Sequence, residues 1–332
     1  MKALVYTAPN EVTYRDEADP ALAGGEVVLR IDAVGICGSD MHAYHGHDPR
    51  RNPPLVLGHE FAGTVVEGPG KGRRYTGNPL ITCGHCEYCV QGRNNLCSNR
   101  TMVGMTRPGA FAEYMSIPQS TLVEIPEGMN AAHAALTEPA ATAVHAIHLA
   151  QRSLVRPLAE SRVLVIGGGA IGLLSALLLH SHGCRGIALA ETNALRRASA
   201  AATGCCDPFD PLGGAGPGEA TCDFVVDAVG AKVTRAAAFR AVKPGGVVLH
   251  IGLQDWASEI DMRKLTLAEI TLVGTYTYST ADLRAAVKGL AAGLFGGLEW
   301  VEERPLSAGR KAFRDLHEGR SAAAKIVLRP GG

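Results

Sequence analysis

The amino-acid sequence predicts a two-domain α/β protein, in which a partly open β-barrel is joined to a doubly wound parallel sheet. Apolar and polar residues alternate in the first third of the chain, as in 27–33, which predicts half-buried strands. Strand-like and helix-like segments alternate beyond about residue 140, which predicts a parallel sheet with crossover helices. The chain of 332 residues is also too long for a single ordinary domain, because domains average roughly 150 residues.

The predicted elements follow in order along the chain. Glycine and proline interrupt the first third at short intervals, as at Gly24-Gly25 and Pro53-Pro54, which is typical of a sandwich or barrel. Helix-like segments then cover 140–151, 170–182 and 194–203, and strand-like segments cover 162–166, 187–190, 224–226, 247–251 and 270–273. The tail, from residue 279, contains one helix pattern and a final strand at 325–328.

Composition limits the partners and the compartment. The chain has 32 Lys+Arg and 32 Asp+Glu, so we expect neither nucleic acid nor a membrane as partner. No window has the ~20 apolar residues of a membrane helix, and the chain opens on a strand-like segment instead of a targeting signal. We therefore expect a cytoplasmic protein, in which the nine cysteines indicate metal sites or free thiols.

A glycine-rich turn predicts a dinucleotide site. Gly167, Gly169 and Gly172 have the spacing G-x-G-x-x-G, directly after a strand and at the start of a helix. The first glycine permits the turn, the second lets the backbone approach a pyrophosphate, and the third lets helix and strand pack closely. The alternative is a glycine-rich turn without a ligand. We also assign Ala170, Ile171, Arg196 and Val229 to the cofactor site.

An acid at the end of the next strand favours NAD over NADP. Glu191 lies nineteen residues after Gly172, where a carboxylate accepts hydrogen bonds from the adenosine ribose and repels a 2′-phosphate. Arg196 and Arg197 lie nearby and could hold a phosphate, which leaves NADP as the alternative. Without a ligand, Glu191 would be a solvated surface acid.

Four closely spaced cysteines predict a structural metal site. Cys83, Cys86, Cys89 and Cys97 have the spacing C-x2-C-x2-C-x7-C. Four thiolates can close tetrahedrally on one Zn²⁺ and leave no position for substrate. An iron–sulfur cluster and a loop of free thiols are the alternatives.

A second metal site is predicted from residues spread over the first half of the chain. Cys37, His59, Glu60 and Glu138 offer a thiolate, an imidazole and two carboxylates, which suit an open, catalytic zinc site. Each also has an ordinary structural interpretation, such as a small core cysteine, a turn histidine or a helix-start acid. Their combination with a nicotinamide site in one chain favours the functional interpretation.

These motifs together resemble the zinc-dependent medium-chain dehydrogenase/reductase family over nearly the whole chain. The matching segments are Gly35–Asp40, Gly58–Gly63, the four-cysteine lobe, Glu138-Pro139, the glycine loop and Lys325–Leu328. Glu138 stands where classical alcohol dehydrogenases have a cysteine ligand, so the chain is most similar to the sorbitol (polyol) and threonine dehydrogenase branch. Gly72-Arg73-Arg74-Tyr75 departs from the usual Gly-Asp-Arg-Val and puts one local turn interaction in doubt.

The resemblance implies a fold, domain limits and residue roles. The fold is a GroES-like barrel interrupted by a Rossmann domain, with the barrel at 1–144 and 276–332, the zinc lobe at 80–100 and the nucleotide domain at 145–275. Two zinc ions are implied, the catalytic one held by Cys37 and His59, with Glu60 or Glu138 completing the set. Ser39 would bond the substrate hydroxyl, and His42 would pass the proton onward through the nicotinamide ribose.

The implied activity is hydride transfer between a polyol or secondary alcohol and NAD, in a homodimer or homotetramer. Alternatives are a threonine 3-dehydrogenase, a phosphorylated-polyol dehydrogenase, a zinc-free enone reductase and a non-enzymatic NAD-binding redox sensor. Tyr44, Met105 and Phe111 are candidate pocket residues, and Arg50 and Arg51 could meet an anionic substrate or form a solvated pair. Leu80 replaces a histidine of threonine dehydrogenases, which favours a neutral substrate because an unpaired buried carboxylate is costly.

Overall fold

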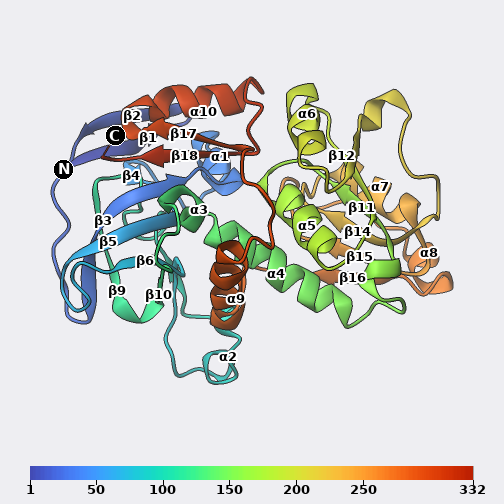
Figure 1. Ribbon diagram of the computed structural model, residues 1–332, viewed down its shortest axis with the longest axis horizontal. Coiled ribbons are helices and arrows are strands. Elements are labelled where there is room, and N and C mark those ends of the chain that lie inside the picture. Colours follow the sequence, from blue (N-terminus) through green and yellow to red (C-terminus); the bar gives the residue numbers. More distant parts are fainter. Residues whose placement is uncertain (332) are drawn as a thin grey trace.

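The computed structural model describes residues 1–331, which form a barrel-like part and a parallel sheet with helices between them (Figure 1). Segments from both ends of the chain lie side by side in the barrel. Its strands are β1 (Lys2–Ala8), β2 (Glu11–Asp16), β3 (Glu26–Gly35), β4 (Leu55–Val56), β5 (Glu60–Glu67), β6 (Arg74–Gly77), β9 (Tyr114–Pro118), β10 (Leu122–Glu124), β17 (Val301–Pro305) and β18 (Lys325–Arg329).

The barrel part consists of two sheets. One has the order β10-β6-β5-β3-β18-β17, with β9 also paired to β3, and the other has the order β2-β1-β4. The last strand, β18, pairs antiparallel with β3 through Val327 and Gly35, so the tail returns to the barrel as the resemblance implies. The predicted alternation in 27–33 is only partly observed, because β3 is central and Val28 is buried as well as Leu29.

The second part is a six-stranded parallel sheet. Its strands are β11 (Arg162–Ile166), β12 (Gly186–Ala190), β13 (Asp207–Phe209), β14 (Cys222–Asp227), β15 (Val242–His250) and β16 (Thr271–Gly274). The order β13-β12-β11-β14-β15-β16 is the doubly wound order of dinucleotide-binding folds. The predicted fold class is therefore confirmed. The sequence did not predict β13, because it is short and contains Pro208.

Helices pack against the parallel sheet, against the barrel, and between the two (Figure 1). They are α3 (Ala131–Ala135), α4 (Thr137–Gln151), α5 (Ala170–Ser181), α6 (Ala194–Ala202), α7 (Lys232–Ala241), α8 (Met262–Leu267), α9 (Thr280–Ala291) and α10 (Gly309–His317). The tail thus contains two helices where the sequence predicts one. The predicted limit between 144 and 145 lies inside α4, whose buried alanines allow neighbouring elements to approach closely.

The two largest hydrophobic cores lie in the two parts of the molecule. The barrel core includes Leu29, Ile31, Phe111 and Phe313. The other large core joins α4, α5 and α9 to one face of the parallel sheet, through residues such as Leu173 and Leu283. Among residues 1–331, no helix combines the length and the apolar character that crossing a membrane requires.

Candidate active site and cofactor sites

Cys37 lies where the chain leaves β3 and enters the short helix α1 (Gly38–Tyr44). It is the N-cap residue of α1 and has an extended backbone. Its N–H donates to Asp40 Oδ2 over 3.0 Å, and the Asp40 carboxylate is fully buried under the first helical turn. An acid is favourable there, because a helix N-terminus leaves backbone N–H groups unpaired. The Cys37 thiol, which is half-buried, is therefore held at a fixed place in the barrel wall.

His59, the residue before β5, faces the same helical turn. Its Nδ1 lies 3.4 Å from Asp40 Oδ1, and its Nε2 lies 3.5 Å from Ser39 Oγ. A carboxylate facing Nδ1 favours the tautomer in which Nε2 carries the lone pair, as in histidines that bind metals. Burial alone would lower the pKa of His59, but Asp40 raises it well above its usual value. The ring is thus oriented before any metal binds.

Glu60 begins β5 and is fully buried against Lys325 of β18. Lys325 Nζ donates to Glu60 Oε1 over 2.7 Å and to Oε2 over 2.6 Å, and it also donates to the carbonyl of Ile36. Burial lowers the pKa of Lys325, but Glu60 raises it beyond that effect. The lysine therefore stays cationic and compensates the buried carboxylate.

Glu138, in the first turn of α4, pairs with a side chain that the sequence did not single out. Its Oε1 accepts a hydrogen bond from the Tyr278 hydroxyl over 3.0 Å, and both side chains are buried. Burial raises the pKa of Glu138 to about 7, while His59 lowers it and Glu60 raises it. Tyr278 lies in the segment before α9, 140 positions further along the chain.

The ligand atoms of Cys37, His59 and Glu60 lie within 4.8 Å of one another. A thiolate, an imidazole and a carboxylate at this spacing fit an open zinc site. The Asp40 contact behind His59 adds the carboxylate that usually orients a metal-binding histidine. Glu138 is not part of this three-residue group. Of the two carboxylates proposed as the final ligand, Glu60 is therefore the one placed with Cys37 and His59.

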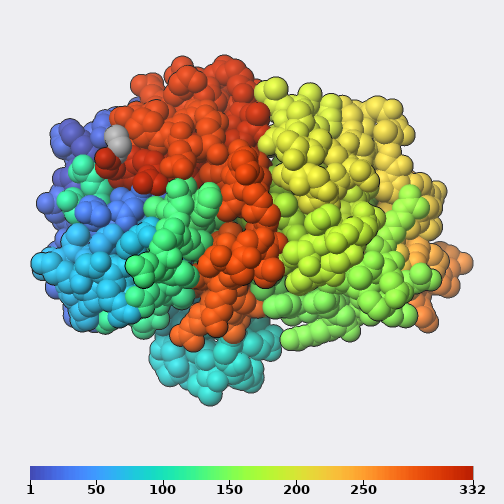
Figure 2. All heavy atoms as spheres, in the orientation of Figure 1, coloured from blue at the N-terminus to red at the C-terminus, as the bar shows by residue number. Residues whose placement is uncertain are grey.

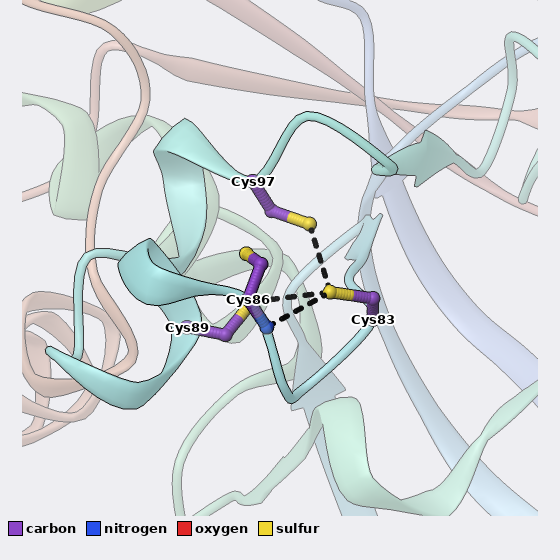
Figure 3. A group of neighbouring side chains, drawn as sticks. All are labelled: Cys83, Cys86, Cys89 and Cys97. Atoms are coloured by element: carbon purple, nitrogen blue, oxygen red, sulfur yellow. Dashed lines mark hydrogen bonds between the residues drawn. The ribbon is translucent and has the colours of Figure 1, made fainter.

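The four-cysteine lobe protrudes from the molecule beside α9 (Figure 2). Cys83 lies in the turn after β7 (Leu80–Ile81), and Cys86 and Cys89 are the N-cap and an inner residue of α2 (Glu87–Val90). Cys97 ends the short helical turn Asn94–Leu96, four positions before β8 (Thr101–Met102), and all four side chains point inward (Figure 3). Cys83 Sγ lies 3.6 Å from Cys97 Sγ and 4.0 Å from Cys89 Sγ. Tetrahedral Zn–S bonds of ~2.3 Å require S···S distances of about 3.8 Å. The four sulfur atoms therefore fit a closed zinc site.

The glycine loop connects β11 to α5 as predicted. Gly167 has φ +101°, and a Cβ there would lie 2.6 Å from Val229 Cγ2. A Cβ at Gly172 would collide with the carbonyl of Gly167, so helix and strand are close only because both positions are glycine. Gly169 is the N-cap of α5 and faces open space. A pyrophosphate could approach the N–H groups of Ala170 and the following residues there.

Glu191 follows β12 and points back to the glycine loop. Its Oε2 accepts from Gly168 N over 2.9 Å, and its Oε1 accepts from Asn193 N over 2.8 Å. Arg197 is bound to the carbonyl of Glu191 and forms an ion pair with Asp210. Arg196 differs, because its Nε is buried without a hydrogen-bond partner.

Two predicted pocket residues lie in the barrel core. Tyr44 and Phe111 are 7% and 1% exposed and belong to the barrel core, where both rings pack against Phe313. Both side chains therefore contribute to the packing of the barrel, and their place in a substrate pocket stays a prediction. Met105 lies in a turn, where its N–H bonds the Met102 carbonyl. His42, in α1, is half-buried and burial lowers its pKa, with a further lowering from His47.

The two arginines predicted as an anion site or a solvated pair differ from each other. Arg50 is exposed and paired with Asp48 over 2.8 Å. Arg51 is 2% exposed, so it is not a solvated charge, and it donates to Asp48, Gly104 and Ser39. Burial of Arg51 was not predictable from its charged neighbours in the sequence.

The structure contains two notable cavities, one at the parallel sheet and one on the barrel. A cavity of about 430 Å³ lies between α4, the lobe and the carboxyl ends of β15 and β16, and its lining includes Asn95, His145, His250 and Tyr276. Carboxyl ends of parallel strands are where open α/β sheets bind ligands. A larger cavity of about 720 Å³ opens on the barrel, but its lining contains none of the predicted site residues.

A barrel with an open metal-ligand group, a closed four-thiolate lobe and a dinucleotide-type sheet together define a metal-dependent oxidoreductase that uses a nucleotide cofactor. Two family models match the chain, "Alcohol dehydrogenase GroES-like domain" over residues 23–127 and "Zinc-binding dehydrogenase" over residues 170–292. The chain belongs to the zinc-dependent medium-chain dehydrogenase/reductase family, in its polyol and threonine dehydrogenase-like branch.

Three relatives illustrate this membership. The chain is 30% identical to L-galactonate-5-dehydrogenase of Escherichia coli K12, with 88% of each chain covered. It is 33% identical to L-threonine 3-dehydrogenase of Mesorhizobium japonicum, with 83% of each covered. A structure from Sinorhizobium meliloti 1021 described as a zinc-binding dehydrogenase and bound to NADP is 30% identical, with a TM-score of 0.87 and 99% of each chain covered. The predicted dependence on zinc and a nicotinamide dinucleotide is thereby confirmed.

Proposed function

We propose that this dehydrogenase transfers a hydride between the carbinol carbon of a polyol or secondary alcohol and NAD. The observation that carries the proposal is the cluster of Cys37, His59 and Glu60 in a chain that also has the glycine loop and Glu191. The L-galactonate and L-threonine dehydrogenases that this chain resembles are, by their names, enzymes for hydroxyl-bearing substrates. Threonine oxidation is the second candidate because of that relative.

We assign the catalytic zinc to Cys37, His59 and Glu60, and the structural zinc to Cys83, Cys86, Cys89 and Cys97. A bound catalytic zinc supplies a Lewis acid that lowers the pKa of an alcohol, and the bound nicotinamide supplies the hydride acceptor. Asp40 orients His59, and Lys325 forms a buried ion pair with Glu60. In this proposal Glu138, which accepts a hydrogen bond from Tyr278, is a neighbouring proton or hydrogen-bond acceptor and not a direct zinc ligand.

The proton route in this proposal starts at Ser39 and leads to His42. Ser39 lies next to the metal group, 3.5 Å from His59 Nε2. His42 follows it by three positions in α1, which places both side chains on neighbouring parts of one helix face. Ser39 would take the hydroxyl proton of the substrate as it gives up its own toward His42. The lowered pKa of His42 favours its neutral form, which can accept a proton.

The charged residues near the proposed zinc ligands favour a neutral, hydroxylated substrate. Arg50 is paired with Asp48, and most Arg51 donors are bound to protein acceptors. Leu80, at the position where threonine dehydrogenases have a histidine, is buried in β7. No cation in this set is available to a substrate carboxylate, whose burial without a partner would be unfavourable.

We propose NAD as the preferred dinucleotide. Glu191 points at the glycine loop, where its carboxylate would accept hydrogen bonds from an adenosine ribose. The unpaired Arg196 Nε and the NADP bound to the Sinorhizobium relative are the observations in favour of NADP. The repulsion between Glu191 and a 2′-phosphate decides our preference.

The oligomer and the compartment complete the proposal. β16 is the edge strand of the parallel sheet, and Leu272 on it is exposed together with Trp256, Met262 and Leu267. An unpaired edge beside apolar side chains favours association, so we propose a homodimer or a homotetramer through this edge.

All nine cysteines are free of disulfide bonds, which agrees with a cytoplasmic location. We retain the domain limits 1–144 with 276–332, and 145–275.

A substrate panel tests the proposed function. The purified protein, loaded with zinc, is assayed for NAD⁺ reduction with sugar alcohols, vicinal diols, simple secondary alcohols, ethanol, L-threonine and a sugar acid. We expect a higher kcat/KM for a diol or sugar alcohol than for ethanol or L-threonine, because buried hydroxyl partners penalise analogues that lack them. Preference for L-threonine over every polyol would replace this proposal with the second candidate. A Cys37→Ser variant is the control for metal-dependent turnover.

A further inference from the structure

Arg51 is a buried cation in direct contact with Ser39. It lies in the loop between α1 and β4, and its side chain is 1% exposed. Nε donates to the Gly104 carbonyl over 3.0 Å, and Nη1 donates to the Ser39 carbonyl over 3.1 Å and to Asp48 Oδ2 over 2.8 Å. Nη2 donates to Ser39 Oγ over 3.3 Å. The contacts with the two carbonyls and with Asp48 would be enough to anchor the loop. The contact with Ser39 Oγ is additional.

The contact with Ser39 Oγ has a defined direction. A guanidinium has N–H donors and no acceptor, so the serine oxygen must accept from Arg51. The hydroxyl proton of Ser39 must then point elsewhere, and the other group near Ser39 Oγ is His59 Nε2 at 3.5 Å. That nitrogen is the one we assign to the metal. Once its lone pair is used, the Ser39 proton is free to be donated along the proton route.

We propose that Arg51 is a positioning residue for the proton route, which fixes the rotamer and the hydrogen-bond polarity of Ser39. This inference rests on the proposed function. Arg51 leaves one lone pair of Ser39 Oγ for the substrate hydroxyl proton and directs the serine's own proton toward His42. One proton enters and one leaves, so Ser39 is unchanged after the transfer. The nearby positive charge also stabilises the serine oxygen while the two protons exchange.

Neighbouring residues provide a matched set of variants. Arg51→Met removes the charge and all four hydrogen bonds, while Arg51→Lys keeps the charge but not the planar fork that reaches several acceptors. Arg50→Met is the control, because Arg50 is the adjacent residue, shares Asp48 as a partner and makes no contact with Ser39. Ser39→Ala, alone and combined with Arg51→Met, completes a double-mutant cycle.

The test measures steady-state kinetics, with the alcohol that the wild type oxidises fastest, in H₂O and in D₂O. We expect Arg51→Met to lower kcat by about 10-fold to 100-fold, part of the usual effect of proton-transfer groups. KM should change less than 3-fold, and the solvent isotope effect on kcat should increase. Arg51→Lys should recover only part of kcat, and Arg50→Met should resemble the wild type. In the Ser39→Ala background, Arg51→Met should have little further effect.

A readout independent of turnover is the Ser39 rotamer in crystal structures of the variants without substrate, together with zinc content and melting temperature. We expect Arg51→Met to release Ser39 from its single rotamer while both zinc ions are retained. A wild-type kcat and isotope effect in Arg51→Met would overturn the inference, and so would an equal effect of that substitution in the Ser39→Ala background. If Arg51→Met does not fold, Arg51→Lys decides by the same criteria. If the wild type oxidises no alcohol, the proposed function fails, while the Ser39 rotamer still tests the role of Arg51.

Discussion

At Glu191, a single carboxylate connects the second strand of the parallel sheet to the phosphate-binding turn. Both of its oxygens accept backbone N–H groups, one from Gly168 and one from Asn193. The side chain is only 8% exposed, so its direction is fixed before a dinucleotide arrives. A preorganised acceptor discriminates between ligands, because the wrong ligand leaves a buried charge unpaired or repelled.

The Glu191→Ala substitution tests this interpretation. We expect NAD⁺ to bind about 10-fold to 100-fold more weakly, since a hydrogen bond to a charged group contributes ~1.5–3 kcal/mol. Rejection of NADP⁺ should decrease, because the repulsion of the 2′-phosphate is removed. Titration calorimetry with both dinucleotides measures the ratio, and Glu259→Ala, at an exposed acid, is the control. A wild type that prefers NADP⁺ would contradict the assignment.

At the scale of elements, the four-cysteine lobe is tied to the segment that leads into α9. Asn95 Nδ2 donates to the Tyr276 carbonyl over 2.8 Å, and Asn94 Oδ1 accepts from Thr280 N. Tyr278, between these anchor points, holds Glu138 next to the catalytic group. The lobe has few apolar contacts of its own, so its shape depends on the metal.

Cys89→Ser should therefore remove the structural zinc and destabilise the lobe. Apparent zinc binding in small sites contributes ~10–16 kcal/mol and is linked to folding. We expect the zinc content to fall from two ions to one per chain and the melting temperature to decrease. The control is Cys206→Ser, at a half-buried cysteine outside the lobe. An unchanged melting temperature with two zinc ions would exclude a structural site.

The joint between α4 and α9 predicts a pH dependence of stability. Asp282 accepts from His145 and His148 of α4, and from the N–H and hydroxyl of Ser279 in a capping box. Burial raises the pKa of Asp282, but the two histidines and Ser279 lower it far below its usual value. A carboxyl whose pKa is lower in the folded state stabilises the protein above its unfolded pKa, and this contribution decreases as the pH falls.

Asp282→Asn should lower stability at pH 6 by about 1–3 kcal/mol, the range for hydrogen bonds to charged groups. The difference between wild type and variant should shrink as the pH falls below about 4, where the unfolded carboxyl becomes protonated. Thermal unfolding followed by circular dichroism between pH 3 and pH 6 measures this difference. Asp261→Asn, which caps α8 without a histidine partner, is the control. A difference that does not depend on pH would refute the ionic contribution.

At the scale of the whole molecule, several of the exposed apolar side chains belong to the segment 253–272 of the parallel-sheet part. Trp256 is 93% exposed and Leu272 is 40% exposed, and α8, between them in the chain, lies at the end of the molecule away from the barrel (Figure 1). The edge of β16 beside them has backbone groups that no strand among residues 1–331 pairs with. A second copy could pair with this edge and cover the patch.

Leu272→Lys, combined with Trp256→Lys, should therefore dissociate the proposed oligomer. Two charges on a face that must be desolvated weaken association strongly, and lysine on an edge strand opposes pairing. Sedimentation velocity should show the mass falling to that of one chain, about 34.7 kDa, with unchanged circular dichroism. Val155→Lys, at an exposed apolar residue outside this patch, is the control. A monomeric wild type would disprove the interface.

The sequence by itself determined the parts of this protein whose chemistry is local. The glycine loop spans six residues, and the four cysteines span fifteen, so spacing alone indicates their shared geometry. The alternation of strands and helices likewise predicted the parallel sheet and its class. Cys37 and His59 could be proposed because each lies in a characteristic short motif. In all these cases the interacting groups are near neighbours along the chain, or the motif itself carries the information.

Only the tertiary structure decided which distant groups meet. Lys325 contacts Glu60 across 265 positions, Tyr278 contacts Glu138 across 140, and Arg51 turns inward to Ser39 although it follows the exposed Arg50. It also grouped the ligand atoms of Glu60, and not those of Glu138, with Cys37 and His59, and it buried Tyr44 and Phe111 in the barrel core. The physical reason is that a charged or aromatic residue takes its role from the partners and the solvent around it. Strand order and packing determine these partners. They bring together segments that are far apart in the sequence, and the residue types of one segment do not indicate which other segment it will contact.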